Sequence, residues 1–208
     1  MRVAIVDYDA GNLGSVQRAC NEVGLNAFIS PDPEEIIKAD KIIFPGVGAA
    51  HSAVDTLHQR GLFQALQEFY QSGKPMLGIC LGSQIVLGYS EEGEKDCLNL
   101  IDGVCERFDI ADRSYKVPHI GWNEIDIKQP HPMLKQVKSG DEFYFVHSYF
   151  TRPAKKEHIF ATTEYAKDFC SVLANDNLFA TQFHLEKSGR KGLSILSEFV
   201  TWEGGSTC

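Results

Sequence analysis

The chain has 208 residues, a length that suits one domain with a substantial buried core. Hydrophobic residues make up 43% and charged residues 23%, which is ordinary globular usage and excludes a disordered or collagen-like chain. The 28 acidic and 20 basic residues give a formal net charge of -8, so a polyanion such as DNA would be repelled on average. We therefore expect a single domain over residues 1–208 that does not bind nucleic acid.

Local signals for membranes, disulfides and metals are lacking. The apolar stretches are far shorter than the roughly 20 residues that cross a bilayer, and the apolar run at 3–6 is too short for a signal peptide. The six cysteines and seven histidines are scattered, with no Cys-x-x-Cys pair and no His-Glu-x-x-His motif. We therefore expect a cytoplasmic protein with reduced thiols and without a metal ion or another cofactor.

The first half of the chain alternates short apolar runs with amphipathic stretches. The pattern predicts, in chain order, a strand over 3–6, a helix from 13 to 23, a strand over 41–44, helices up to 57 and over 62–70, and a strand over 75–79. Continuous apolar strands that alternate with helices are typical of a parallel sheet covered on both faces.

From about residue 103 the pattern becomes rich in strands. The predicted strands lie at 104–108, 123–127, 143–146, 158–163, 170–174 and 179–183, and a helix over 193–200 closes the chain. No linker rich in Pro, Gly or Ser separates the two halves. We therefore predict a three-layer α/β sandwich with a mostly parallel central sheet, which continues into an additional strand-rich part in the second half.

A cysteine bracketed by glycines is the most informative local feature. Cys80 lies in Gly-Ile-Cys-Leu-Gly-Ser-Gln over 78–84, between a predicted buried strand and a helical stretch. This is the spacing of the Gly-x-nucleophile-x-Gly elbow, a strained turn that leaves no room for neighbouring side chains. Free N–H groups at the start of the following helix would favour the thiolate and stabilise an oxyanion. The other five cysteines lack this bracket, and we interpret them as core or surface residues.

A cysteine nucleophile needs a base, and the base needs a group that orients it. His184 and Glu186 follow the apolar strand over 178–183, and their spacing of two would direct both side chains to one side of an extended chain. His147 is the rival base, but a hydrogen-bonded histidine at a strand end is the more economical interpretation. An oxyanion donor is expected at Gly46-Val47-Gly48, where a strand ends at the same sheet edge as Cys80.

Together these segments resemble the class I, triad-type glutamine amidotransferases, and most closely the family of glutaminase subunits of imidazole glycerol phosphate synthase known as HisH. The resemblance extends nearly end to end. It rests on the segments 7–16, 45–48, 78–84, 117–123, 144–149 and 180–188. It implies a flavodoxin-like arrangement of the α/β sandwich.

The resemblance also implies a reaction and the residues that perform it. Cys80 would attack the side-chain amide of glutamine, with His184 as general base and then acid and Glu186 as the residue that orients His184. A glutamyl thioester would form and be hydrolysed. The residues implied for the oxyanion and for substrate binding are Gly46, Val47, Gly48, Leu81, Gln84 and Ser148.

A glutaminase of this kind implies a partner, because ammonia released into water at pH 7 is mostly protonated and no longer nucleophilic. In the family the partner is the (β/α)₈-barrel cyclase HisF, which forms a heterodimer with the glutaminase. The cyclase uses ammonia to convert a ribulosyl-aminoimidazole carboxamide ribotide to imidazole glycerol phosphate and AICAR. The positions matched to that interface are Asn12, Pro118, Trp122, Asn123 and Lys187.

Three residues depart from the family pattern. Leu185 stands where proline usually separates the histidine from the glutamate, Asp9 stands where glycine is usual, and Ser83 replaces a larger apolar residue beside the glutamine pocket. The departures leave open a HisH-like paralogue that supplies ammonia to a surface-sugar amidotransferase. The alternatives of another class are a free-standing cysteine γ-glutamyl hydrolase and a flavodoxin-like binding module without catalysis.

Overall fold

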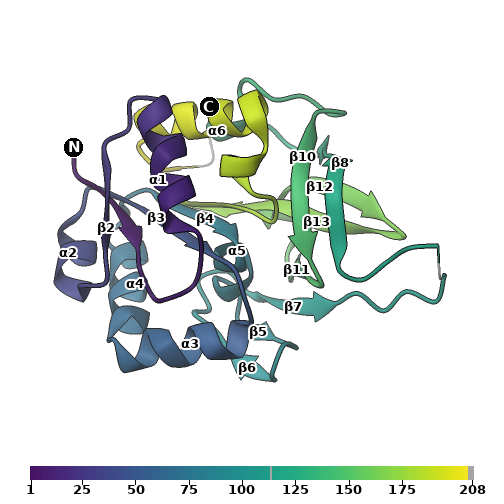
Figure 1. The fold of residues 1–208 in the computed structure, drawn as a ribbon, viewed down its shortest axis with the longest axis horizontal. Helices are drawn as coiled ribbons and strands as arrows, with labels where there is room; N and C mark the ends of the chain where they lie inside the picture. Colours follow the sequence, from purple (N-terminus) through teal and green to yellow (C-terminus); the bar gives the residue numbers. More distant parts are fainter. Residues whose placement is uncertain (113, 206–208) are drawn as a thin grey trace.

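The computed structural model describes residues 1–112 and 114–205 (Figure 1). A 12-stranded sheet crosses the molecule, with the order β2-β1-β3-β4-β14-β13-β11-β7-β5-β6. The parallel strands are β2 (Ala27–Ser30), β1 (Val3–Val6), β3 (Lys41–Gly46), β4 (Met76–Cys80) and β14 (Leu178–Thr181). The remaining strands of this sheet are β13 (Lys167–Asn175), β11 (Tyr149–Pro153), β7 (Gly103–Arg107), β5 (Tyr89–Ser90), β6 (Lys95–Asp96), β12 (Ile159–Tyr165) and β9 (Asp126–Ile127).

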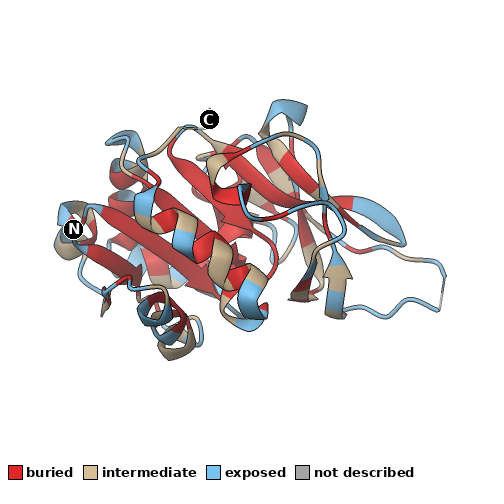
Figure 2. Cartoon of the chain, turned by 90° about the horizontal axis from the view of Figure 1, so that it is seen from above, coloured by how far each residue is buried: buried red, intermediate tan, exposed pale blue. Residues whose placement is uncertain are grey.

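Helices cover both faces of the parallel part, as Figure 1 shows. One face carries α1 (Leu13–Glu22) and α6 (Gly189–Thr201), and the other carries α2 (Pro33–Lys38), α3 (Ala50–Gln59), α4 (Leu62–Gln71) and α5 (Leu81–Ile85). Successive strand residues point to opposite faces, so β1 gives Val3 and Ile5 to one apolar core and Ala4 and Val6 to the other. The inner strands β1, β3, β4 and β14 are accordingly buried along their whole length (Figure 2), whereas the edge strand β2 is buried only in part.

The predicted α/β sandwich with a mostly parallel sheet and a strand-rich second half is confirmed. The pattern missed β2 and α2, although Asp32 and Pro33 are a usual helix start: the Asp32 carboxylate accepts a hydrogen bond from the N–H of Glu34 at 2.9 Å.

The prediction of one continuous sheet is wrong in the second half. β8 (His119–Glu124) and β10 (Glu142–His147) pair with each other as an antiparallel ribbon beside the main sheet, and Tyr144 of β10 also forms an isolated antiparallel bridge with His184. The strand expected over 123–127 is divided, because β8 ends at Glu124 and β9 crosses to pair with β12. This ribbon forms one wall of the site described below.

Cys20, Cys80, Cys97, Cys105 and Cys170 are buried free thiols, and Cys208 lies outside the described residues. Within residues 1–112 and 114–205, no three His, Cys, Asp or Glu side chains gather as metal ligands would. None of the helices in this part of the chain has the length and hydropathy that crossing a bilayer requires.

Candidate active site

Cys80 occupies a strained turn between β4 and α5. It has φ 54° and ψ −106°, a left-handed backbone conformation that is rare for a residue with a side chain. A Cβ atom on Gly78 would come within 2.9 Å of the Cβ of Ala180, and one on Gly82 would collide with the carbonyl oxygen of Phe44. The glycine bracket is therefore required by packing, as expected for a nucleophile elbow.

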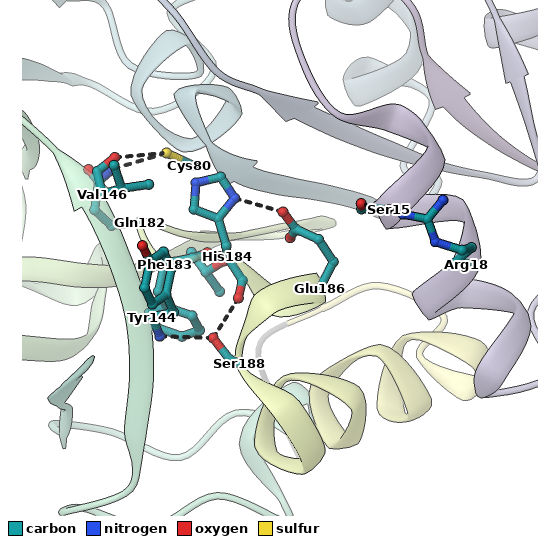
Figure 3. Close-up of polar contacts among 11 residues, drawn as sticks. Ser15, Arg18, Cys80, Tyr144, Val146, Gln182, Phe183, His184, Glu186 and Ser188 are labelled. Atoms are coloured by element: carbon teal, nitrogen blue, oxygen red, sulfur yellow. Dashed lines mark hydrogen bonds and ion pairs between the residues drawn. The ribbon is translucent and has the colours of Figure 1, made fainter. Parts of the chain in front are cut away.

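His184 and Glu186 meet in a buried ion pair (Figure 3). The Nδ1 atom of His184 lies 2.8 Å from Oε1 of Glu186, and the two side chains are only 2% and 3% exposed. The expected extended backbone between them is wrong, because Glu186 lies in the 3₁₀ turn η3 (Leu185–Lys187). The turn brings the carboxylate back towards the ring, while the main-chain N–H of His184 donates to the carbonyl oxygen of Tyr144 at 3.0 Å.

The other nitrogen of His184, Nε2, faces the sulfur of Cys80 (Figure 3). Neither this nitrogen nor Oε2 of Glu186 has a hydrogen-bond partner within the described residues. Burial lowers the pKa of His184, but the Cys80 sulfur and the Glu186 carboxylate outweigh it and raise the pKa to about 10. The three side chains can therefore hold a proton on the imidazole beside a sulfur nucleophile.

A pocket of about 450 Å³ opens beside Cys80. It brings together nine of the residues singled out in the sequence: Val47, Gly48, Cys80, Leu81, Gln84, Pro118, His147, Ser148 and Lys187. Gly46 lies directly opposite Cys80 in the pairing of β3 with β4, but it is buried and does not line the pocket. Val47 and Gly48 follow the end of β3, so their backbone lies at the sheet edge beside the sulfur.

Gln182, which was not among the predicted site residues, connects Gln84 to the sulfur of Cys80. Gln84 donates from Nε2 to the carbonyl oxygen of Tyr149 at 2.9 Å and to Oε1 of Gln182 at 3.2 Å. Gln182 in turn directs its Nε2 to the sulfur of Cys80 at 3.9 Å. The available signal was a buried glutamine directly after the apolar strand β14.

Neither His147 nor Ser83 is placed to act directly on the sulfur of Cys80. His147 is the last residue of β10, and its Nδ1 lies 2.7 Å from the carbonyl oxygen of Tyr149, which fits a strand-end structural histidine better than a base for Cys80. Ser83 was expected beside the glutamine pocket, but it does not line the pocket. It is fully buried and donates from Oγ to the carbonyl oxygen of Cys80 at 2.6 Å, so it supports the elbow.

The remaining predicted interface residues do not line this pocket, and Trp122 and Asn123 line a separate hollow. Trp122 is 52% exposed, and its ring lies 6.1 Å from the ring of Tyr144, over which the Nζ atom of Lys187 lies at 5.8 Å. Asn123 is partly buried next to Trp122 on β8. Asn12 is exposed at the start of α1, and the preceding residue, Gly11, approaches the backbone of Val47.

Comparison with known proteins identifies the family. The family model for "Glutamine amidotransferase class-I" matches residues 4–202. The imidazole glycerol phosphate synthase subunit HisH of Maridesulfovibrio salexigens is 47% identical over 205 residues, covering 96% of each chain. The HisH subunit of Methanosarcina acetivorans is 48% identical over 202 residues, covering 96% of this chain and 98% of that protein.

Solved structures with much lower identity share the fold. PurLQS from Thermotoga maritima matches with a TM-score of 0.73 at 14% identity, covering 96% of this chain and 97% of that chain. The glutaminase domain of Trypanosoma brucei CTPS with bound acivicin matches with a TM-score of 0.69 at 17% identity, covering 100% of this chain and 96% of that chain. The chain therefore belongs to the class I glutamine amidotransferases, in the family of HisH subunits of imidazole glycerol phosphate synthase.

Proposed function

We propose that this chain is the glutaminase subunit of an imidazole glycerol phosphate synthase. It hydrolyses L-glutamine to glutamate and ammonia as a single glutamine amidotransferase domain, and it passes the ammonia to a HisF-type (β/α)₈ cyclase subunit in histidine biosynthesis. Its full-length similarity to HisH subunits supports this function. The buried free thiols suit the reducing cytoplasm, where we place the reaction.

The first half of the reaction forms a thioester. The Cys80 sulfur attacks the side-chain amide carbon of glutamine, and the carbonyl oxygen becomes an oxyanion. The C–N bond then breaks while His184 gives its Nε2 proton to the leaving nitrogen, so ammonia departs and a γ-glutamyl thioester remains on Cys80. The Glu186 carboxylate holds Nδ1 of His184 and stabilises the charged ring.

The second half uses water. His184, now neutral, takes a proton from a water molecule that attacks the thioester carbonyl. The C–S bond breaks, glutamate leaves, and the sulfur is again paired with the protonated imidazole of His184. One glutamine and one water therefore give one glutamate and one ammonia, with the triad returned to its starting state.

Backbone N–H groups stabilise the oxyanion in both halves. Leu81 is the first residue of α5, so its N–H has no partner within the helix and lies beside the sulfur. The backbone of Val47 and Gly48 supplies the second donor from the opposite strand end. Gln84 and Ser148, which both line the pocket, would contact the substrate glutamine.

The partner binds over the pocket mouth. Val47, Val117, Ile120 and Trp122 are among the few large apolar side chains left exposed; Val47 lines the pocket, and the other three lie in the segment 117–122, which contains the lining residue Pro118. A cyclase seated there would enclose the route of ammonia and keep it from water. Trp122 is the anchor of this surface, together with Asn12, Pro118, Asn123 and Lys187.

The placement of Cys80 at a strained elbow, facing a buried His184–Glu186 pair, is the observation that carries this function. The test measures glutamate release from glutamine by the chain alone, with a HisF-type cyclase, and with the cyclase and its nucleotide substrate. We expect stimulation by partner and nucleotide that Cys80→Ala abolishes. No stimulation would favour a paralogue with another ammonia acceptor, and rapid turnover without a partner would favour a free-standing hydrolase.

A further inference from the structure

A chain of hydrogen bonds links the β8–β10 ribbon to the pocket. His119 and His147 are directly opposite each other at the end of the ribbon, and Nδ1 of His119 lies 3.0 Å from Nε2 of His147. On the inner side, Nδ1 of His147 lies 2.7 Å from the carbonyl oxygen of Tyr149. On the outer side, Nδ2 of Asn123 lies 3.4 Å from Nε2 of His119.

With both rings neutral, the donors and acceptors along these hydrogen bonds can be assigned in only one way. The carbonyl oxygen of Tyr149 can only accept, so His147 carries its proton on Nδ1 and its Nε2 accepts from His119. His119 therefore also carries its proton on Nδ1, and its Nε2 accepts from the amide of Asn123. The second amide proton of Asn123 goes to the carbonyl oxygen of Glu164 at 2.9 Å. Every ring nitrogen of the two histidines is thereby satisfied.

The surroundings keep both rings neutral, as this assignment requires. His119 and His147 are 3% and 5% exposed, and the ring of His119 is stacked on Tyr165 and Phe145 at 3.9 Å and 4.9 Å between ring centroids. Burial lowers the pKa of His119 to about 4. Burial, together with the neighbouring His119 and His184 rings, lowers the pKa of His147 to about 3.

The inner end of the chain meets the groups that line the pocket. The carbonyl oxygen of Tyr149 accepts from both His147 and Gln84, and Gln84 continues through Gln182 to the sulfur of Cys80. His147, Ser148 and Tyr149 are consecutive residues of the pocket wall. The position of this wall therefore depends on the His119–His147 pair. Among the described residues, neither ring of the pair forms a hydrogen bond to the sulfur of Cys80.

We propose that His119 and His147 form a positioning pair that fixes the glutamine-binding wall at 147–149 and connects it to strand β8. This inference rests on the proposed glutaminase function and adds residues that hold the substrate rather than perform the chemistry. The outer part of β8 carries Ile120 and Trp122, which are 59% and 52% exposed. A partner that presses on this strand would therefore change the pocket wall through the pair.

The test compares two substitutions of His119. His119→Phe keeps an aromatic ring between Tyr165 and Phe145 but leaves Nε2 of His147 without a donor inside the protein. His119→Asn restores a donor near the position of Nδ1. Because a buried unsatisfied acceptor is costly, we expect His119→Phe to raise the KM for glutamine about tenfold, to change kcat less than threefold, and to weaken stimulation by the cyclase. His119→Asn should recover most of the wild-type KM.

His131→Phe is the matched control. His131 is also a buried, neutral histidine packed against aromatic rings, and burial lowers its pKa to about 4. It takes no part in the hydrogen bonds that link His119 and His147 to the pocket, and it does not line the pocket. A loss of stability alone would appear in both Phe variants. A change in KM and in cyclase stimulation should appear only in His119→Phe, and equal behaviour of the two variants would overturn the proposal.

Glutamine binding without turnover separates this inference from the proposed function. Calorimetry of Cys80→Ala and of Cys80→Ala/His119→Phe measures the Kd for glutamine when no hydrolysis can occur. A Kd about tenfold weaker in the double variant supports the positioning pair even if the wild-type chain fails to release glutamate, a failure that would overturn only the proposed function. An unchanged Kd, or no binding of glutamine to either protein, would overturn the pair.

Discussion

Two histidines flank the same pocket in opposite protonation states. His184 faces a sulfur and a carboxylate, which raise its pKa to about 10 despite burial. His147 is buried as well, but its partners are a carbonyl oxygen and a second imidazole, and its pKa is lowered to about 3. Burial alone therefore does not decide the role of a histidine in this molecule.

The difference lies in what each ring can exchange. His184 has one nitrogen fixed by Glu186 and one left free towards Cys80, as proton transfer requires. Both nitrogens of His147 are committed to hydrogen bonds, so this ring has no free position from which to move a proton. We therefore assign the chemistry to the first histidine and the shape of the pocket to the second.

The strongest way to break this comparison is to remove the charge beside His184. Glu186→Gln keeps the shape of the side chain but not the carboxylate that stabilises the protonated ring. We expect kcat for glutamine hydrolysis in the complex to fall about 10²- to 10⁴-fold, with KM nearly unchanged. Steady-state kinetics with the cyclase and its nucleotide measure both constants.

Glu157→Gln is the control for that experiment. Glu157 also lies beside a histidine, with Oε1 3.9 Å from Nε2 of His158, but this pair is away from the pocket. Its kcat should equal that of the wild type. If Glu186→Gln retained more than a tenth of the wild-type kcat, the carboxylate would not be needed to support His184.

Removal of Trp122 tests whether the exposed face of β8, the strand that pairs with His147 and its neighbours in β10, binds the cyclase. The Trp122 ring is half exposed on β8, and a buried aromatic anchor at an interface often contributes 2 kcal/mol or more, so Trp122→Ala should weaken cyclase binding about 30-fold. Titration calorimetry measures the Kd. Phe28→Ala on β2, at the far edge of the sheet, should bind normally, and equal losses in both variants would remove Trp122 from the interface.

Acid unfolding tests the histidines that are kept neutral. His119, His131 and His147 have pKa values lowered to about 4, 4 and 3, below the ordinary value of 6.5. The unfolded chain therefore binds more protons, and stability is complete above pH 6.5 and falls below it. Each histidine contributes up to about 1.4 kcal/mol per pH unit. The raised pKa of His184 acts oppositely, since its contribution is complete below pH 6.5 and is lost as pH rises through about 10.

Urea unfolding at several pH values between 7 and 5 measures this dependence. His131→Phe should lower the slope of unfolding free energy against pH by the equivalent of about one proton near pH 5 and by less near pH 7. The substitution need not preserve the absolute stability, because only the slope is compared. An identical slope in wild type and variant would show that His131 titrates in the folded protein as it does in the unfolded chain.

The elbow could be predicted because its requirements are local. A nucleophile with positive φ between a strand and a helix leaves no room for side chains at positions 78 and 82, and glycine at both positions records that constraint directly. The neighbouring Gly46 followed from one general rule, that parallel strands present their carboxyl ends at the same edge.

The ribbon wall could not be predicted in the same way. His119 and His147 are paired through strands whose connection, residues 125–141, includes β9, and nothing near either residue specifies the register that places them opposite each other. The 3₁₀ turn at Glu186 was missed for a related reason. It depends on contacts with distant residues, since the N–H of His184 binds the carbonyl oxygen of Tyr144 and Ser188 bridges the same two residues.

The smallest expected effect concerns Leu185, which stands where the family usually has proline. His184 has φ −88° and ψ 111°, the extended conformation that precedes proline, and Leu185 is the first residue of η3, where proline is tolerated. Replacing the fully buried Leu185 by proline removes about one CH₂ group from the core, which costs about 0.8 kcal/mol. The reduced freedom of the unfolded chain returns about 0.4–1 kcal/mol.

Leu185→Pro should therefore leave kcat within about twofold and the unfolding free energy within about 1 kcal/mol of the wild type. Kinetics in the complex and urea unfolding check the two values. A kcat more than tenfold lower would mean that residue 185 itself sets the angle between His184 and Glu186. An unchanged kcat would mean that Tyr144 and Ser188 hold His184 from outside the turn, so that the triad geometry is fixed by the ribbon and α6 whichever residue stands at 185.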